Sequence, residues 1–239
     1  MPSGGSCLLS SHNLSEFVVN PFKSNAFFDY DKFKEAVRKS VITMNEVLDE
    51  GIELHPLEIQ RESARNLRQV GIGVMGIADM LIKLGIRYGS EESFEISDKI
   101  GFVLADTAMN QSALLAKKYG SFPSMKLDKV IESPYVKYNT SEETYELIKT
   151  YGLRNSQLLT IAPTGSISTM LGVSGGIEPM FMLSYTRKTE TLNDGKETYY
   201  KVHTPIVFKY MQENNIKDEK DLPDYFITAM DLKIGRAHV

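Results

Sequence analysis

Residues 157–168 read Gln-Leu-Leu-Thr-Ile-Ala-Pro-Thr-Gly-Ser-Ile-Ser, and they give the clearest structural signal in the chain. The first half, residues 157–162, is a compact apolar run that ends at Pro163 and predicts a buried strand. Glycine and small hydroxyl residues follow, and a short helix over Ile167–Leu171 is expected after them. The stretch therefore predicts a strand, a tight turn and a helix in succession.

The turn after Ala162 also has the composition of an anion site. Free N–H groups at a helix start, with serine and threonine hydroxyls beside them, bind phosphate. Gly165 would let the backbone approach the anion closely. The loop contains no lysine, so it is not a Walker A site. Two interpretations stay open on the residues alone, phosphate binding and a plain strand-to-helix turn.

A glycine-rich connection, residues 172–179, leads from this helix to a second apolar run at residues 180–186. Within the connection, a buried Glu178 could orient backbone amides, but we interpret the residue as structural, as a satisfied cap. A turn signal at residues 193–196 and an alternating segment at residues 198–203 then predict a hairpin. The next helix is expected over residues 204–213, with Pro205 at its first position; a further element is expected over residues 221–231.

Upstream, the apolar periodicity predicts three helices, each with its own cap. Residues 29–50 form the first, begun by Asp29 or Asp31 and closed by Gly51, and its apolar face is made of Phe33, Val37, Val41, Met44 and Leu48. A long helix follows Ser90 to residue 119, and a short one follows Ser141 to residue 151. We expect residues 1–28 to be loop with short extended pieces, and residues 121–140 to be loop.

One motif suggests a nucleotide site that its context does not support. Gly71-Ile-Gly-Val-Met-Gly76 matches the spacing G-x-G-x-x-G. The preceding residues, 61–69, are polar, so no buried strand is expected before the glycines, and no second strand follows to close a βαβ unit. We therefore interpret the glycines as a close strand–helix junction that needs small residues.

Composition excludes several classes of protein. The 239 residues hold 27 Lys and Arg against 31 Asp and Glu, a net charge of −4, which gives no broad field for nucleic acid. No apolar run approaches the roughly 18 residues of a membrane span, and we see no secretory signal. The single cysteine, Cys7, permits no internal disulfide or Cys-pair zinc site. A cytoplasmic protein with no nucleic-acid or membrane partner is expected.

Five separated motifs resemble the catalytic chain of ribonucleotide reductase, and in particular its adenosylcobalamin-dependent class II branch. They occur in family order over nearly the whole of residues 1–233. The motifs are Gly4-Gly-Ser-Cys-Leu-Leu-Ser10 with Asn13-Leu-Ser-Glu-Phe-Val18, Gly71-Ile-Gly-Val-Met-Gly-Ile-Ala-Asp79 with Leu84-Gly-Ile-Arg-Tyr-Gly-Ser90, Gly152-Leu-Arg-Asn-Ser156, Ala162-Pro-Thr-Gly-Ser-Ile-Ser168 and Gly176-Ile-Glu-Pro179.

The resemblance implies an α/β fold, roughly the C-terminal half of a ten-stranded barrel that is truncated at both ends. It implies a reaction in which a cysteine thiyl radical, generated through adenosylcobalamin, helps replace the ribose 2′-hydroxyl with hydrogen. A cysteine pair then supplies the reducing electrons as it closes to a disulfide. The implied partners are a ribonucleoside di- or triphosphate and a thioredoxin-type reductant, and the resemblance is compatible with a homodimer.

Carried over by position, Cys7 matches one of the two reducing cysteines. The residues that match the substrate-phosphate loop are Pro163, Thr164, Gly165, Ser166 and Ile167, with Ser168 beside them. Gly71, Gly73 and Gly76 would then pack the barrel, in agreement with their interpretation above. The radical cysteine, the second reducing cysteine and most cobalamin contacts are expected upstream of this sequence, so the chain alone is expected to be inactive.

Other features keep alternatives open. The family commonly has small and apolar residues where Ser11-His12 stands, yet a surface or core histidine is the better interpretation of His12 than a ligand. His55 and His203 have no carboxylate or cysteine neighbour in sequence, so we assign no metal site. The alternatives are a fragment of the iron-dependent class I large subunit and a stand-alone nucleotide-phosphate module. We interpret residues 234–239 as a non-native tail, and His238 receives no role.

Overall fold

A computed structural model describes residues 4–189 and 198–232 of the chain. The expected turn at residues 193–196 and the suspected tail at residues 234–239 lie outside the described residues. The described residues divide into two compact units. Unit 1 contains residues 4–12, 29–73 and 96–162, and unit 2 contains residues 13–28, 74–95, 163–189 and 198–232.

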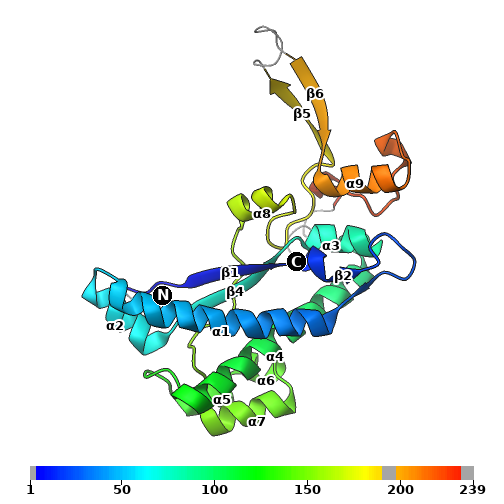
Figure 1. The fold of residues 1–239 in the computed structure, drawn as a ribbon. Helices are drawn as coiled ribbons and strands as arrows, with labels where there is room; N and C mark the ends of the chain where they lie inside the picture. The colour runs from blue at the N-terminus through cyan, green and yellow to red at the C-terminus, as the bar shows by residue number, and fades with distance from the viewer. Residues whose placement is uncertain (1–3, 190–197, 233–239) are drawn as a thin grey trace. The chain divides into compact units, whose positions relative to one another are not determined.

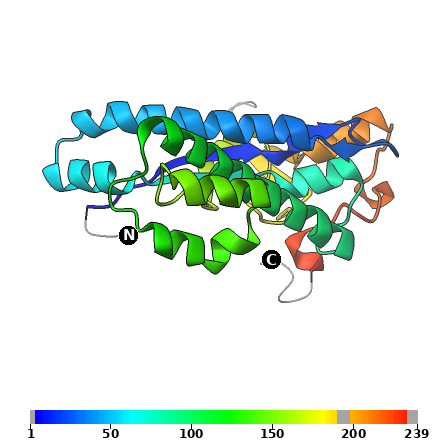
Figure 2. The ribbon, with the colours of Figure 1, turned by 90° about the horizontal axis from the view of Figure 1, so that it is seen from below.

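Unit 1 consists of long and short helices beside a strand pair. Strand β1 (Leu8–Asn13) pairs with β4 (Val70–Met75), and helix α1 lies beside the pair (Figures 1 and 2). The helices whose residues lie wholly or mostly in unit 1 are α1 (Tyr30–Leu54), α2 (Glu58–Leu67), α4 (Glu91–Tyr119), α5 (Leu127–Glu132), α6 (Pro134–Tyr138) and α7 (Glu142–Tyr151).

The helix predictions that rest on capping residues and on apolar periodicity are confirmed. All five residues of the expected apolar face of α1 are buried, and the Asp29 side chain accepts a hydrogen bond from the Lys32 amide at 2.9 Å. Ser90 and Ser141 likewise accept from amides three residues on, at 3.2 and 3.3 Å, as N-caps do.

Two boundary predictions were wrong. Helix α1 does not stop at Gly51 but continues to Leu54, because an exposed helix interior tolerates glycine at a cost of only about 1 kcal/mol. Residues 121–140 are not all loop, since they contain the short helices α5 and α6. Pro134 begins α6 instead of excluding a helix, because the first helical position needs no N–H donor.

The expected strand at residues 157–162 is only partly formed. It pairs with β4 through the Val70 amide to the Gln157 carbonyl at 3.0 Å, the Ile72 amide to the Leu158 carbonyl at 2.8 Å, and a parallel bridge from Ile72 to Leu159. Leu158 is buried, but Ile161 is 49% exposed, so burial ends before Pro163. The prediction of a buried strand was therefore wrong for the second half of the segment.

Strand β4 itself accounts for the glycine motif. All six of its residues are buried, and no strand precedes them in residues 61–69. A β-carbon on Gly71 would lie 3.0 Å from the Cys7 sulfur, and one on Gly73 would overlap the Thr160 carbonyl oxygen. Gly76 then turns the chain into helix α3 with a left-handed φ of 73°. The interpretation of these glycines as a close strand–helix junction is confirmed.

A buried polar network in unit 1 fixes the chain just before the β4 partner segment. The Asn155 carboxamide is 1% exposed and makes four hydrogen bonds. Its oxygen accepts from the Asn45 amide nitrogen at 3.1 Å and from the Ser112 hydroxyl at 3.0 Å. Its nitrogen donates to the Asn45 oxygen at 3.0 Å and to the Arg68 carbonyl at 2.9 Å. The network therefore ties α1, α4 and Arg68, the residue that ends α2, to residue 155.

Unit 2 contains the expected hairpin and C-terminal helix. Strands β5 (Ser184–Thr189) and β6 (Thr198–His203) are antiparallel, with Ser184 opposite His203. The first strand thus begins four residues later than expected. The other elements of unit 2 are η1 (Leu14–Phe17), β2 (Val18–Val19), β3 (Phe27–Phe28), α3 (Ile77–Leu84), α8 (Gly165–Leu171), α9 (Pro205–Glu213), η2 (Glu219–Asp221) and η3 (Ala229–Asp231).

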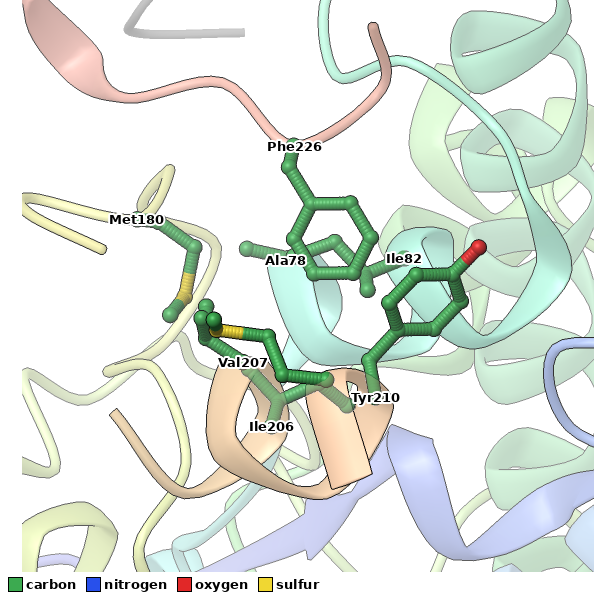
Figure 3. Packing of buried hydrophobic residues seen from close by; sticks show 8 residues of the cluster. Ala78, Ile82, Met180, Ile206, Val207, Tyr210 and Phe226 are labelled. Carbon is green, nitrogen blue, oxygen red and sulfur yellow. The ribbon is translucent and has the colours of Figure 1, made fainter. Parts of the chain in front are cut away.

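The core of unit 2 gathers around α3 and α9. Figure 3 shows Ala78 and Ile82 of α3 facing Val207 and Tyr210 of α9, with Phe226 packed beside them. The Tyr210 and Phe226 rings lie 4.8 Å apart between centroids. The hydrophobic cluster therefore holds one face of α3 and leaves its first turn next to the glycine-rich connection at residues 172–176.

The described residues are mixed α/β and contain three two-stranded sheets, β1–β4, β2–β3 and β5–β6, without a closed barrel. Among the helices described, none has the length and apolar character that crossing a membrane requires.

Candidate functional site

The predicted phosphate loop, Pro163–Ser168, lies in unit 2 and leads into helix α8. The helix begins at Gly165, two residues earlier than expected. Pro163, Gly165, Ser166 and Ile167 are exposed, whereas the side chains of Thr164 and Ser168 are buried. The structure thus separates the six predicted residues into four that face solvent and two that face the protein.

Thr164 is the most constrained residue of the phosphate loop. It precedes α8 with a φ of 53°, in the left-handed region that a β-branched residue rarely adopts. Its hydroxyl oxygen accepts a hydrogen bond from the Gly176 amide at 2.9 Å in a buried setting. The side chain is therefore turned away from the exposed residues and fixes the loop from behind.

A second loop, Gly172–Gly176, packs behind the phosphate loop, and we call it the backing loop. The Val173 amide donates to the Ser168 carbonyl at 3.0 Å. A β-carbon on Gly175 would lie 3.2 Å from the Pro163 carbonyl oxygen, which explains the absence of a side chain at this position. The two loops therefore form one layered structure held largely by backbone atoms.

Asp79, in the first turn of α3, supports the backing loop. Its carboxylate accepts from the Ser174 amide at 2.7 Å, and the Ser174 carbonyl accepts from the Gly76 amide at 2.9 Å. The residue is 2% exposed. Burial raises the pKa of the Asp79 carboxyl, while the bond from Ser174 and the Lys83 charge act to lower that pKa.

Sequence reasoning did not assign a role to Asp79, although the residue stands in one of the quoted motifs. The available signal was a single carboxylate inside the apolar helix Ile77–Leu84, where only a paired acid is expected. Glu178, which was interpreted as structural, is exposed, so it does not reach into the protein to orient backbone amides. A pocket of about 430 Å³ lies at this part of unit 2, and its lining includes Asp79, Thr169, Ser174 and Thr204.

Cys7 belongs to unit 1 and lies beside Gly71. Its sulfur contacts the Leu8 carbonyl at 3.7 Å, and burial raises the pKa of the thiol. The sulfur therefore stays protonated at neutral pH.

The histidines of the described residues do not suggest a metal centre. His12 packs edge-on against Phe33, with ring centroids 5.8 Å apart, and burial lowers its pKa. His203 lies 3.0 Å from the Glu219 carboxylate, a partner that was not apparent in the sequence. Among the residues that the structure describes, no three His, Cys, Asp or Glu side chains are grouped to hold a metal ion.

Residues 2–234 match the family described as "Ribonucleotide reductase, barrel domain". The chain belongs to the ribonucleotide reductase family. Similar relatives include the vitamin B12-dependent ribonucleoside-diphosphate reductase of Thermoplasma acidophilum. It is 32% identical over an alignment of 240 positions, which covers 95% of this chain and 28% of the relative.

Other reductases are similar over a smaller part of the chain. The vitamin B12-dependent ribonucleoside-diphosphate reductase of Mycobacterium tuberculosis is 31% identical over 76% of this chain and 23% of the relative. The ribonucleoside-diphosphate reductase subunit alpha of Chlamydia pneumoniae is 32% identical over 73% of this chain and 18% of the relative. The chain thus spans less than a third of the length of these ribonucleotide reductases. Family membership confirms the resemblance that the five motifs indicated.

Proposed function

We propose that this chain is part of an adenosylcobalamin-dependent ribonucleotide reductase, which converts ribonucleotides to 2′-deoxyribonucleotides. The observation that supports this most is the similarity to a vitamin B12-dependent relative over 95% of the chain, against 73% for a relative named as an alpha subunit. In this proposal the chain supplies about half of a ten-stranded barrel, acts in the cytoplasm and receives electrons from a thioredoxin-type protein.

The phosphate loop would hold the di- or triphosphate of the substrate. Gly165, Ser166 and Ile167 are exposed at the start of α8, where backbone N–H groups have no partner within the helix. The Ser166 hydroxyl adds a donor, and open space around Gly165 leaves room for phosphate oxygens. Thr164 and Ser168, which face the protein, would shape the loop and not contact the substrate.

Cys7 would be one of the two reducing thiols. In the reaction the ribose 2′-carbon loses its oxygen as water and gains hydrogen, while two thiols lose two electrons and two protons and join as a disulfide. A thiol that stays protonated at neutral pH suits this role, because it carries the proton that the reaction consumes. The second thiol is not part of this sequence, which contains one cysteine.

We infer that most contacts to adenosylcobalamin come from outside this sequence, as the resemblance implies. His12 is packed against a phenylalanine and His203 is near a carboxylate, and the described part of the chain shows no cluster of metal ligands. When bound, the cofactor would supply the radical that starts the reaction. No step assigned to the residues of this chain passes through the cofactor.

Bulky substitutions in the phosphate loop should weaken nucleotide binding. We expect Gly165→Leu and Ser166→Leu each to lower the affinity of the 239-residue chain for cytidine diphosphate by about tenfold or more, roughly 1.4 kcal/mol, because each side chain would fill the anion position. Isothermal titration calorimetry measures this. Ser24→Leu, in an exposed turn of the same unit, is the matched control and should bind like the unchanged chain. Absence of binding heat in the unchanged chain would remove the proposal for this loop.

The chain alone should not reduce nucleotides. A single cysteine cannot close the intramolecular disulfide that supplies the electrons, so we expect no deoxynucleotide above background with added adenosylcobalamin and dithiothreitol. Chromatography of the nucleotide products tests this expectation. Formation of deoxycytidine diphosphate by the purified chain, and its loss in Cys7→Ser, would show that the assignment of the second thiol to another segment is wrong.

A further inference from the structure

The phosphate loop, the backing loop and α3 are joined by one series of hydrogen bonds. The first bond runs from the Gly176 amide to the Thr164 hydroxyl at 2.9 Å. The second joins the same backing loop to α3, from the Ser174 amide to the Asp79 carboxylate at 2.7 Å. All four residues belong to unit 2, and 95 positions separate Asp79 from Ser174 in sequence. The Asp79 side chain, which is remote from the phosphate loop in sequence, is thus connected to that loop through two hydrogen bonds and the backing loop between them.

Ser174 is held through both its backbone N–H and its backbone carbonyl. Its amide donates to Asp79, and its carbonyl accepts from the Gly76 amide at 2.9 Å. Both partners stand at the start of α3, whose Ala78 and Ile82 side chains belong to the core cluster. The backing loop is therefore anchored to a helix in which residues 77–82 are all buried.

The anchoring of the backing loop matters because of the backbone conformation of Thr164. A β-branched residue with a φ of 53° is strained, and such conformations persist only where the surroundings enforce them. The bond from Gly176 is the contact that restrains the Thr164 side chain from behind. If the backing loop moved, Thr164 could relax, and the exposed amides that follow it would change direction.

Burying the Asp79 carboxylate also costs free energy. Asp79 is 2% exposed in a helix that is otherwise mostly apolar, and burying a charge costs free energy unless it is paired. A hydrogen bond from an N–H group to a carboxylate is stronger than one to a neutral acceptor. The bond from Ser174 thus offsets part of the cost of burying Asp79 and attaches the backing loop to α3.

We propose that Asp79 is a positioning residue for substrate phosphate binding, acting through Ser174 and Gly176 on Thr164. The proposal rests on the phosphate role proposed above for Pro163–Ser168. Asp79 touches no substrate in this arrangement. Its effect is to keep the amides of Gly165, Ser166 and Ile167 in the orientation that meets a phosphate group.

The connection can be tested without any ligand, by amide hydrogen exchange in the 239-residue chain. We expect Asp79→Ala to speed exchange at the Gly176 amide by roughly tenfold. Asp79→Asn should leave exchange within about threefold of the unchanged chain, since its amide oxygen can still accept from Ser174. Ile82→Ala, on the same helix but with its side chain in the core cluster, is the control for loss of stability alone. Equal acceleration in Asp79→Ala and Ile82→Ala would overturn the proposal.

Calorimetry with cytidine diphosphate then tests the consequence for binding. We expect Asp79→Ala to weaken the affinity about 5- to 20-fold, Asp79→Asn to restore most of it, and Ile82→Ala to leave it nearly unchanged at a temperature where all variants are folded. Cytidine without phosphates should show no difference among them. If Ser166→Leu weakens binding but Asp79→Ala does not, the positioning role is wrong and the phosphate loop stands. If the unchanged chain binds no diphosphate, the phosphate role itself fails, and with it the positioning role.

Discussion

Gly73→Ala should destabilise unit 1 by about 2–4 kcal/mol, because a β-carbon at this position would overlap the Thr160 carbonyl oxygen. The obstacle is backbone and cannot rotate away. The Thr160 amide also donates to the Ile72 carbonyl at 3.2 Å, so separating the two segments to make room would weaken their pairing. Overpacking typically costs about 1–3 kcal/mol, and the weakened backbone hydrogen bond adds about 1 kcal/mol.

Urea denaturation followed by circular dichroism measures this loss, and exchange of the Ile72 amide reports on the strand pair itself. Gly101→Ala is the matched control, since a β-carbon there meets nothing within 4 Å in helix α4. It should stabilise the chain by about 0.5–1 kcal/mol, because alanine favours a helix interior. Equal stability of the two variants would contradict the strand packing described here.

The sequence predicted the features that depend on neighbours a few positions away. The caps at Asp29, Ser90 and Ser141 and the buried face of α1 follow from three- and four-residue spacings, and the structure confirms them. The short helix after Thr164 was found for the same reason, with an error of two residues at its start. These features are local, so a single sequence contains the information needed to infer them.

The features that were missed depend on contacts across the chain. Nothing near Gly73 in sequence reveals that Thr160 lies against it, and Asp79 meets Ser174 across 95 positions. The glycine motif could be separated from a nucleotide site by its context, but the partner that requires small residues could not be named. The candidate site was therefore predicted as a segment, while the residues that support it required the structure.

Asn155→Leu should have the other large effect on stability. Leucine has the same heavy-atom branching as asparagine but provides none of the four hydrogen bonds that this carboxamide makes. The substitution would leave the Arg68 carbonyl and parts of Asn45 and Ser112 buried without partners. Each such group costs about 1–3 kcal/mol, so we expect a loss of about 3–5 kcal/mol in the free energy of unfolding.

Asn139→Leu provides the matched comparison, since Asn139 makes an exposed hydrogen bond to the Tyr135 carbonyl at 2.9 Å. It should cost less than about 1 kcal/mol, because water replaces the lost partner. Urea denaturation of both variants measures the difference in the free energy of unfolding. Asn155→Asp tests the two halves of the network separately, because its carboxylate can still accept from Ser112 but cannot donate to the Arg68 carbonyl. An Asn155→Leu chain as stable as Asn139→Leu would mean that water reaches the network, and the start of the β4 partner segment would then not depend on it.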